Sequence, residues 1–346
     1  MNNFKTEIIS WYSANKRSLP WRETSEPYCI WLSEIMSQQT RIEQSLPYYL
    51  KFIDAYPTIF HLAEAKEDEV LKLWQGLGYY SRARNLHATA KYIAYELNGK
   101  FPDNYNDLLK LKGVGDYTAS AIASICFNEP APVVDGNVYR VLSRYFGVDI
   151  PINSTKGIKY FKTLAKELID HEQPGEYNQG IMEFGARQCK PQSPDCNICP
   201  LNESCVALQK KMVALLPVKI KKGKIKHRHF NYLIINNDEK TILEQRTAND
   251  IWKNLYEFPL IEDKHELTEE QIIKHDIFKK YIPHNKFSIH LYNNDKIVHK
   301  LSHQYIHTKF WIVNLQTKIE NGIEKKQLNE YPVPILIANF VEEFSF

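Results

Sequence analysis

Residues 108–119, with the sequence LLKLKGVGDYTA, decide the fold of the first part of the chain. The apolar spacing on either side of the two glycines predicts a helix, a tight hairpin and a second helix. Gly113 and Gly115 permit backbone conformations with positive φ and let a phosphate approach the main-chain amides. The same amides open the second helix, whose N-terminus favours an anion. A purely structural turn between two helices is the alternative for this segment taken alone.

The surrounding sequence has helical periodicity as well. From residue 1 to about 210, apolar residues recur at spacings of three and four, as in 119–126 and 138–145. No heptad or short repeat is sustained. The pattern predicts an all-α domain over residues 1–217, with the helix–hairpin–helix element at about 108–127.

A basic segment follows this helical part. Residues 218–229, VKIKKGKIKHRH, carry a run of lysine, arginine and histidine around Gly223. Such a run predicts an exposed linker, and its charge suits the phosphate backbone of a nucleic acid. A solvated connector without a partner explains the run equally well.

Beyond residue 229 the periodicity changes from helical to alternating. The alternation predicts strands at 230–235, 241–244, 287–292, 297–301 and 309–315, and helical segments at 268–281 and in the final residues. The sequence Asn-Asn-Asp at 236–238 is typical of a hairpin turn. We therefore expect a separate α+β domain over residues 230–346 in a multidomain chain.

Composition indicates a folded protein and excludes several classes. The chain has 346 residues, 43% hydrophobic and 25% charged, which argues for two domains and against disorder. No apolar run approaches the roughly 18–20 residues of a membrane span, and the first residues lack the apolar core of a secretory signal. The net charge of +3 neither requires nor excludes a polyanion. We expect a cytoplasmic monomer without a membrane partner, associated with the nucleoid if the source is bacterial.

Four of the six cysteines lie close together in the sequence. Cys189, Cys196, Cys199 and Cys205 fall within seventeen residues, in the pattern C-x6-C-x2-C-x5-C. Without a secretory signal, such a group indicates metal ligation before disulfides. Four thiolates can surround a tetrahedral zinc ion or an iron–sulfur cluster, and the chemistry of the donors leaves both open.

These features together resemble a known superfamily. The cysteine spacing is similar to the loop that closes the helical domain of the endonuclease III family of DNA glycosylases, and residues 108–119 resemble its helix-hairpin-helix element. A carboxylate, Asp135, follows the hairpin by about twenty residues after a proline-rich loop. Taken alone, Asp135 or Asn137 would be a helix cap. The resemblance implies one four-iron four-sulfur cluster in loop 189–205, and contacts from the hairpin glycines to DNA phosphates.

Within that superfamily the chain resembles the MutY family of adenine DNA glycosylases over nearly its whole length. The motifs are 19–22 (LPWR), 31–40 (WLSEIMSQQT) and 73–86 (LWQGLGYYSRARNL), with Ser37 where the family usually has leucine. The resemblance implies removal of adenine mispaired with 8-oxoguanine or guanine in duplex DNA, within base excision repair. Tyr117 stands where lyases of the superfamily carry a Schiff-base lysine, which implies a monofunctional glycosylase.

The resemblance also assigns the chemistry. Glu34 corresponds to the general acid, and its helical neighbours Ile30 and Trp31 would raise its carboxyl pKa by apolar packing. Its proton would make adenine a better leaving group. Asp135 would stabilise the oxocarbenium ion or a covalent intermediate, and Asn137 and Tyr117 would line the same pocket. A surface glutamate on an amphipathic helix is the alternative for Glu34 alone.

Other matched positions imply contacts with DNA. Gln39, Leu77 and Tyr79 correspond to family residues that enter the duplex once the target base has left the helix, and Thr40 belongs to the same motif as Gln39. Ordinary core packing is the alternative for Leu77 and Tyr79.

The last part of the chain resembles the MutT-like, Nudix-fold domain of the same family. The similar segments are 243–246 (LEQR) and 255–259 (LYEFP), but the acidic Nudix box is missing, so no pyrophosphatase activity is expected. Leu301, Ser302 and His303 correspond to the Phe-Ser-His loop that contacts 8-oxoguanine, with leucine replacing phenylalanine. An edge-strand hydroxyl is the alternative for Ser302.

Two rival functions remain. One is a glycosylase with lyase activity of the endonuclease III type, which Tyr117 and the second domain disfavour. The other is a non-catalytic DNA-binding or redox protein on the same scaffold, which the presence of both Glu34 and Asp135 disfavours.

Overall fold

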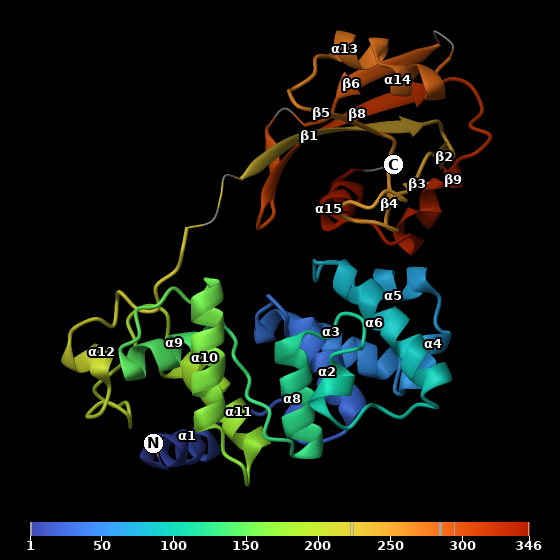
Figure 1. Cartoon of the computed structure of the whole chain (residues 1–346). Coiled ribbons are helices and arrows are strands. Elements are labelled where there is room, and N and C mark those ends of the chain that lie inside the picture. Colours follow the sequence, from blue (N-terminus) through green and yellow to red (C-terminus); the bar gives the residue numbers. More distant parts are fainter. Residues whose placement is uncertain (1, 222, 224, 284–285, 294, 345) are drawn as a thin grey trace. The chain divides into compact units, whose positions relative to one another are not determined.

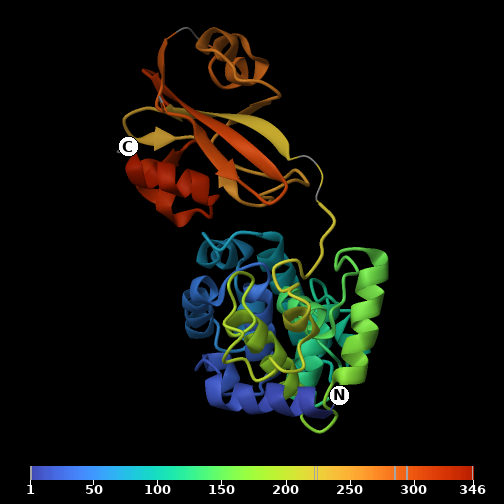
Figure 2. The same ribbon diagram turned by 90° about the vertical axis from the view of Figure 1, so that its left-hand side faces the viewer.

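The computed structural model of the chain describes residues 2–221, 223, 225–283, 286–293, 295–344 and 346. It divides into two compact units. The first contains Met1–Glu64 and Asn85–Lys222, and the second contains Ala65–Arg84 and Gly223–Phe346. Figure 1 and Figure 2 show helices in the first unit and a sheet flanked by helices in the second.

The first unit is helical throughout its described residues, as predicted. Its helices are α1 (Asn2–Asn15), α2 (Pro27–Ser37), α3 (Ile42–Ala55), α4 (Ile59–Glu64), α6 (Ser81–Lys91, which begins in the second unit), α7 (Tyr105–Leu108), α8 (Asp116–Phe127), α9 (Gly136–Phe146), α10 (Thr155–Leu168), α11 (Pro174–Arg187) and α12 (Val206–Gln209), with a 3-10 turn at Pro20–Arg22 and a π turn at Tyr92–Glu96. None of the helices among the described residues is long and apolar enough to cross a membrane.

The core that supports the candidate site lies among α1, α9, α10 and α11. Phe4 and Ile8 of α1 are buried together with Val141 of α9, Phe161 of α10 and Phe184 of α11. These apolar residues recur at helical spacing on each element, so burying them fixes the helices against one another. The start of α9, where Asp135 lies, is therefore held on a packed scaffold.

The predicted hairpin joins a short α7 to α8. Gly113 has φ 81°, and a Cβ there would lie 2.8 Å from the Cβ of Asn85, so glycine is required by both conformation and space. Gly115 instead has extended backbone, with φ −96° and ψ 179°, and precedes α8 as its N-cap residue. Both glycines permit a positive φ, and of the two only Gly113 adopts one. A Cβ at Gly115 would meet no atom within 4 Å, so this position lies open.

The second unit is built on a seven-stranded sheet. Its strands are β1 (Lys226–Asn236), β2 (Lys240–Thr241), β5 (Leu260–Asp263), β6 (Phe287–Leu291), β7 (Ile297–Lys300), β8 (Gln304–Leu315) and β9 (Ile323–Glu324), with a separate pair β3 (Glu244–Gln245) and β4 (Tyr256–Glu257). Its helices are α5 (Glu67–Leu73), α13 (Glu269–Lys274), α14 (Asp276–Tyr281), α15 (Ile335–Glu343) and the 3-10 segment Lys325–Glu330. The strand order is β6-β8-β1-β2-β9, with β5 paired to β1 and β7 paired to β8.

The sheet confirms the predicted α+β class and adds a pairing that the sequence did not predict. The hairpin around 236–238 is present, because Asn236 pairs with Thr241 in antiparallel register. At the centre, however, β1 and β8 run parallel from the pair Lys226–Gln304 to the pair Asn236–Asn314. Because β1 begins at Lys226, the last residues of the basic segment 218–229 lie in a strand and not in a linker.

Both faces of the sheet are covered. On one face, Leu233 and Trp311 are buried together with Ile272 of α13 and Phe278 of α14. On the other, Phe310 stacks on Phe340 of α15 with ring centroids 4.2 Å apart. The helix predicted over 268–281 is divided into α13 and α14 by the extended backbone of His275, whose Nδ1 accepts the main-chain N–H of Ile277.

Ala65–Arg84 belongs to the second unit through several polar contacts. The ammonium of Lys72 donates to the carbonyl of Tyr331 at 3.1 Å. The Gln75 side chain accepts the main-chain N–H of Val333 at 3.1 Å, and Arg84 donates to the carbonyl of Lys253 at 2.8 Å. By these contacts the segment carrying Leu77 and Tyr79 belongs to the second unit, whereas the sequence places it in the helical domain.

Candidate active site

A cavity of about 170 Å³ lies in the first unit. The structure brings to it all four residues that the sequence assigned to chemistry: Glu34 from α2, Tyr117 from α8, and Asp135 and Asn137 from the start of α9. Ser37 and Thr40 also line it, together with Arg17, Trp21, Arg22, Ile30, Ser33, Ile42, Ile125, Gln179, Met182, Glu183 and Ala186. Two carboxylates separated by about a hundred residues in sequence thus share one hollow.

Glu34 is the one carboxyl side chain in α2; the other ionisable side chains of this helix are Tyr28 and Cys29 near its start. Proline at the first turn begins this helix with φ already set, and most of the neighbouring side chains are buried. Burial raises the pKa of the Glu34 carboxyl to about 7, while a hydrogen bond with Tyr117 lowers it and the charge of Asp135 raises it. The carboxyl is therefore partly protonated at neutral pH, as a general acid requires.

Tyr117 is the second residue of α8 and remains a neutral hydroxyl. Its oxygen lies 3.1 Å from the sulfur of Met182. Burial, followed by the negative charges of Glu34 and Asp135, raises the pKa of Tyr117 well above its usual value. The hydroxyl can thus donate to Glu34 and orient it, but it supplies no amine for a Schiff base.

Asp135 caps α9 and lines the cavity with the same side chain. Its Oδ1 accepts the main-chain N–H groups of Asn137 at 2.8 Å and Val138 at 2.7 Å, and its Oδ2 accepts the Asn137 amide at 2.8 Å. Burial raises the pKa of Asp135, while these hydrogen bonds lower it. The helix-cap interpretation is correct, and it does not compete with a place in the cavity.

A network fixes Asn137 behind Asp135. The Asn137 side-chain oxygen accepts Arg140 Nη2 at 2.9 Å, and the same guanidinium donates to the carbonyls of Gly185 at 2.6 Å and Cys189 at 2.8 Å. A Cβ on Gly185 would lie 2.7 Å from the Cβ of Asn137, so glycine lets α11 approach the start of α9.

A buried ion cluster, which no sequence pattern predicted, lies in the same cavity. Glu183 is 2% exposed and accepts hydrogen bonds from Arg17 at 2.7 Å and from Arg22 at 2.8 Å. Burial alone would raise the pKa of Glu183, but the two guanidinium groups lower it to about 2. Nothing local pointed to this pairing, because the arginines precede Glu183 by more than 160 residues. The cluster sets fixed positive charge at the wall of the cavity.

Comparison with known proteins decides the family. The chain is 36% identical, over 352 aligned residues, to the adenine DNA glycosylase of Buchnera aphidicola subsp. Schizaphis graminum, covering 99% of this chain and 98% of that protein. The chain belongs to the adenine DNA glycosylase family. It is a DNA N-glycosylase that functions in base excision repair.

Other similarities agree with this assignment. Residues 32–175 match the family model described as HhH-GPD superfamily base excision DNA repair protein, and residues 231–343 match the NUDIX domain. The human adenine DNA glycosylase is 43% identical over 60% of this chain and 40% of its own length. Among solved structures, a thermostable thymine-DNA glycosylase has a TM-score of 0.56 at 30% identity, covering 60% of this chain and 96% of that one. A non-covalent endonuclease III–DNA complex has a TM-score of 0.52 at 25% identity, covering 61% and 96%.

The four cysteines of the glycosylase line one small pocket in the first unit, together with Arg144. Arg144 Nη1 lies 3.4 Å from the Cys189 sulfur and donates to the Lys190 carbonyl at 2.7 Å. Across the described ranges, no set of three or more His, Cys, Asp or Glu side chains is gathered on a single metal-ion position. A four-iron cluster places each thiolate on a different iron and so separates its ligands more than one ion does. The four soft donors around one pocket fit such a cluster.

The residues predicted to contact DNA lie in both units of the glycosylase. In the first, Gln39 is exposed with φ 54° just after α2, and Thr40 lines the cavity that contains Glu34 and Asp135. In the second, a cavity of about 390 Å³ is lined by Tyr79, Ser302 and His303. Tyr79 is 42% exposed, whereas Leu77 is 3% exposed, so core packing describes Leu77 in this structure.

Proposed function

We propose that this glycosylase removes adenine paired with 8-oxoguanine or guanine, with Glu34 as general acid and Asp135 as the stabilising carboxylate. The observation that carries the proposal is the shared cavity, in which the two carboxyls have different surroundings. Burial raises the pKa of Glu34 to about 7, so its carboxyl is partly protonated at neutral pH. Burial also raises the pKa of Asp135, but three N–H groups stabilise its ionised form and oppose that rise. We also propose that it acts as a monomer.

The chemistry follows from these two surroundings. The Glu34 proton is donated to the imidazole-ring nitrogen of adenine, so the base leaves as a neutral molecule, and such help is worth about 10²–10⁴-fold in rate. Loss of the base leaves positive charge on the sugar. The ionised Asp135 then stabilises or captures this cation, as a carboxylate does in glycoside hydrolysis. Tyr117 orients Glu34 throughout.

A single-turnover base-release assay tests this function. With an 8-oxoguanine:adenine duplex in the presence of excess enzyme, we expect free adenine and an intact strand that breaks only after alkali. Tyr117 provides no amine, so the abasic product is not cleaved by the enzyme. Efficient nicking that borohydride traps as a covalent complex would contradict a monofunctional glycosylase.

We propose that Cys189, Cys196, Cys199 and Cys205 hold one four-iron four-sulfur cluster. Purified protein is then expected to be brown and to contain about four irons per chain, because each of the four thiolates binds one iron. Metal analysis of the purified protein measures this directly. One zinc per chain, with no iron, would overturn the cluster in favour of a zinc site.

Removing one cluster ligand is expected to affect more than the metal. In Cys199→Ser we expect iron loss, a lower Tm and weaker DNA binding, because Arg140 and Arg144 of α9 contact the loop that the cluster holds. Cys29→Ser, outside the loop, is the matched control and should retain its iron. A Cys199→Ser protein that folded, bound and cut normally would contradict a structural and DNA-docking role.

We propose that Ser302 and His303 read the lesion base. Both lie in the turn between β7 and β8 and line a cavity with the exposed Tyr79. 8-Oxoguanine differs from guanine by one carbonyl and one ring N–H, a difference worth roughly 1–3 kcal/mol for a well-placed hydrogen bond. Ala65–Arg84, the segment that contains Tyr79, belongs to the second unit. Deleting the residues after about 225 would therefore also remove the contacts that this segment makes with the rest of that unit. Point substitutions are therefore the cleaner test.

The variant Ser302→Ala/His303→Ala is expected to reduce the preference for 8-oxoguanine over guanine opposite adenine by about 5-fold to 150-fold. Excision from the guanine mismatch should change little, because neither side chain lines the catalytic cavity. Rates on the two mismatches are compared at one fixed salt concentration, since phosphate contacts depend on salt. Ser288→Ala, a change on exposed β6, is the control. An unchanged preference in the double variant would show that other residues read the lesion.

A further inference from the structure

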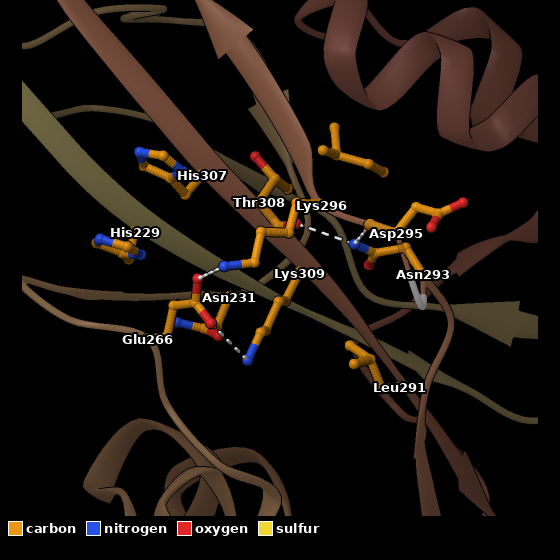
Figure 3. A pocket seen from close by; sticks show the side chains of 11 residues that line it. His229, Asn231, Glu266, Leu291, Asn293, Asp295, Lys296, His307, Thr308 and Lys309 are labelled. Carbon is orange, nitrogen blue, oxygen red and sulfur yellow. Dashed lines mark hydrogen bonds and ion pairs between the residues drawn. The ribbon is translucent and has the colours of Figure 1, made fainter.

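A separate cavity of about 210 Å³ lies on the sheet of the second unit (Figure 3). It is lined by His229, Asn231, Glu266, Leu291, Asn293, Asp295, Lys296, Ile297, His307, Thr308 and Lys309. None of the residues proposed for excision or lesion reading lines it. Its polar character therefore needs another explanation.

The parallel register of β1 and β8 builds the floor of this cavity. His229 pairs with His307 and Asn231 with Lys309, so these four side chains point to one face of the sheet. The next residues on that face, Leu233 and Trp311, are buried in the core formed with α13 and α14. The face thus changes from apolar to cationic and polar along the same two strands.

The ammonium of Lys309 has hydrogen-bond donors that are not used in this cavity. Its side chain is 27% exposed, and its ammonium donates to the Leu267 carbonyl at 3.0 Å. The carboxylate oxygen of Glu266 lies 3.9 Å away, too far for a hydrogen bond. No other hydrogen bond to this ammonium is present among the described residues, so a partly buried cation with three donors has a single bonded partner.

Two stacked histidines form the adjoining wall. The rings of His229 and His307 have centroids 4.7 Å apart and an interplanar angle of 15°. His307 Nε2 lies 2.9 Å from His227 Nδ1, whereas the imidazole ring of His229 has no hydrogen-bond partner within the part of the chain that the structure describes. The histidines therefore add ring nitrogens that can donate to an oxygen-rich ligand.

Glu266 marks the position of an anion in the cavity. It is exposed and lies between β5 and α13, where one carboxylate oxygen is 3.0 Å from Lys296 and the other is 3.9 Å from Lys309 (Figure 3). The Glu266 carboxylate thus lies beside two ammonium groups, at a position where a phosphate oxygen would be attracted by the same charges. Because it projects from an exposed connection, it can be displaced without disturbing the sheet.

We propose that this cavity binds a phosphate group, with Lys309, Lys296 and the two histidines as donors and Glu266 as an internal anion that the phosphate displaces. Lysine binds phosphate as a point charge, and the ring N–H groups supply directed bonds. The volume of about 210 Å³ is below the roughly 300–1,000 Å³ of drug-sized ligand sites, which fits one phosphate of a nucleotide or of a DNA backbone.

Histidine-ring NMR of the full-length protein, titrated with inorganic phosphate at constant ionic strength, tests the proposal. We expect saturable shifts of the His229 and His307 signals. In Glu266→Gln, phosphate should bind about tenfold more tightly, equivalent to roughly 1.4 kcal/mol, because the competing charge is gone. Lys309→Met should abolish the saturable shifts. The matched controls are Glu270→Gln and Lys274→Met, which alter an exposed ion pair on α13 in the same unit.

Two further titrations identify the source of the phosphate. Shifts that saturate at lower concentrations of dAMP than of inorganic phosphate indicate a free nucleotide, and shifts produced by an undamaged duplex indicate a DNA backbone. The absence of saturable shifts in Glu266→Gln, or an equal gain in Glu270→Gln, would overturn the proposal. The result for Glu266→Gln can be interpreted even if Lys309→Met fails to fold. Adenine excision should persist in both variants, so a failure here is distinct from a failure of the proposed function.

Discussion

Replacing Glu34 with glutamine is expected to reduce the rate of adenine release by about 10²–10⁴-fold, while binding to the mismatch is retained. Glutamine keeps the shape of the side chain but cannot lose a proton to the leaving base. Single-turnover excision and equilibrium binding to the same duplex separate the two effects. Glu26→Gln, an exposed change at the start of the same helix, should behave like wild type. Near-normal excision by Glu34→Gln would remove Glu34 from the role of acid.

The pH dependence of excision gives Glu34 a second signature. Its protonated form is the active one, and burial raises its pKa to about 7. The wild-type rate is therefore expected to fall as pH rises through about 7, as the proton is lost. The residual rate of Glu34→Gln should lack this decline. A wild-type rate that stayed constant across that range would show that another group limits the reaction.

Asparagine at position 135 is expected to slow excision by about 10²–10³-fold, the range typical of losing one preorganised electrostatic contact at a reacting centre. The positive charge that develops on the sugar would meet a neutral amide. Asparagine caps a helix about as well as aspartate, so the start of α9 should remain folded. The substitution thus separates the charge of Asp135 from its capping role.

Two measurements on Asp135→Asn complete this test. Its Tm should remain close to that of wild type, because the side-chain oxygen can still accept the N–H groups of Asn137 and Val138. Its excision rate is measured under single-turnover conditions on the same duplex as wild type. Wild-type excision with an unchanged Tm would leave the helix cap as the only role of this residue.

The features predicted correctly from sequence are those that depend on short spacing. The turn between α7 and α8, the position of Asp135 before α9 and the four close cysteines each lie within a few residues of their partners. The resemblance then assigned Glu34, Tyr117, Asp135 and Asn137, which come from separate segments, to one pocket, and all four line the same cavity. Local spacing and resemblance together account for the candidate site.

The features that were missed depend on residues distant in the chain or on burial. Glu183 pairs with Arg17 and Arg22 across more than 160 residues, and no local pattern encodes that contact. For Leu77 and Tyr79 the sequence left core packing and DNA contact open, because exposure depends on the fold; Leu77 is buried and Tyr79 is exposed. Gly115 permits a positive φ but has an extended backbone, so the residue type alone did not determine its conformation.

The parallel pairing of β1 and β8 has a consequence for biosynthesis. During translation, β1 leaves the ribosome well before β8, and at about 5–20 residues per second the delay lasts several seconds. Throughout that time, the apolar run Phe230–Ile235 lacks its central partner and exposes an unpaired edge that favours aggregation. Nascent chains stalled before Gln304 should therefore be the species of this enzyme that most need a chaperone.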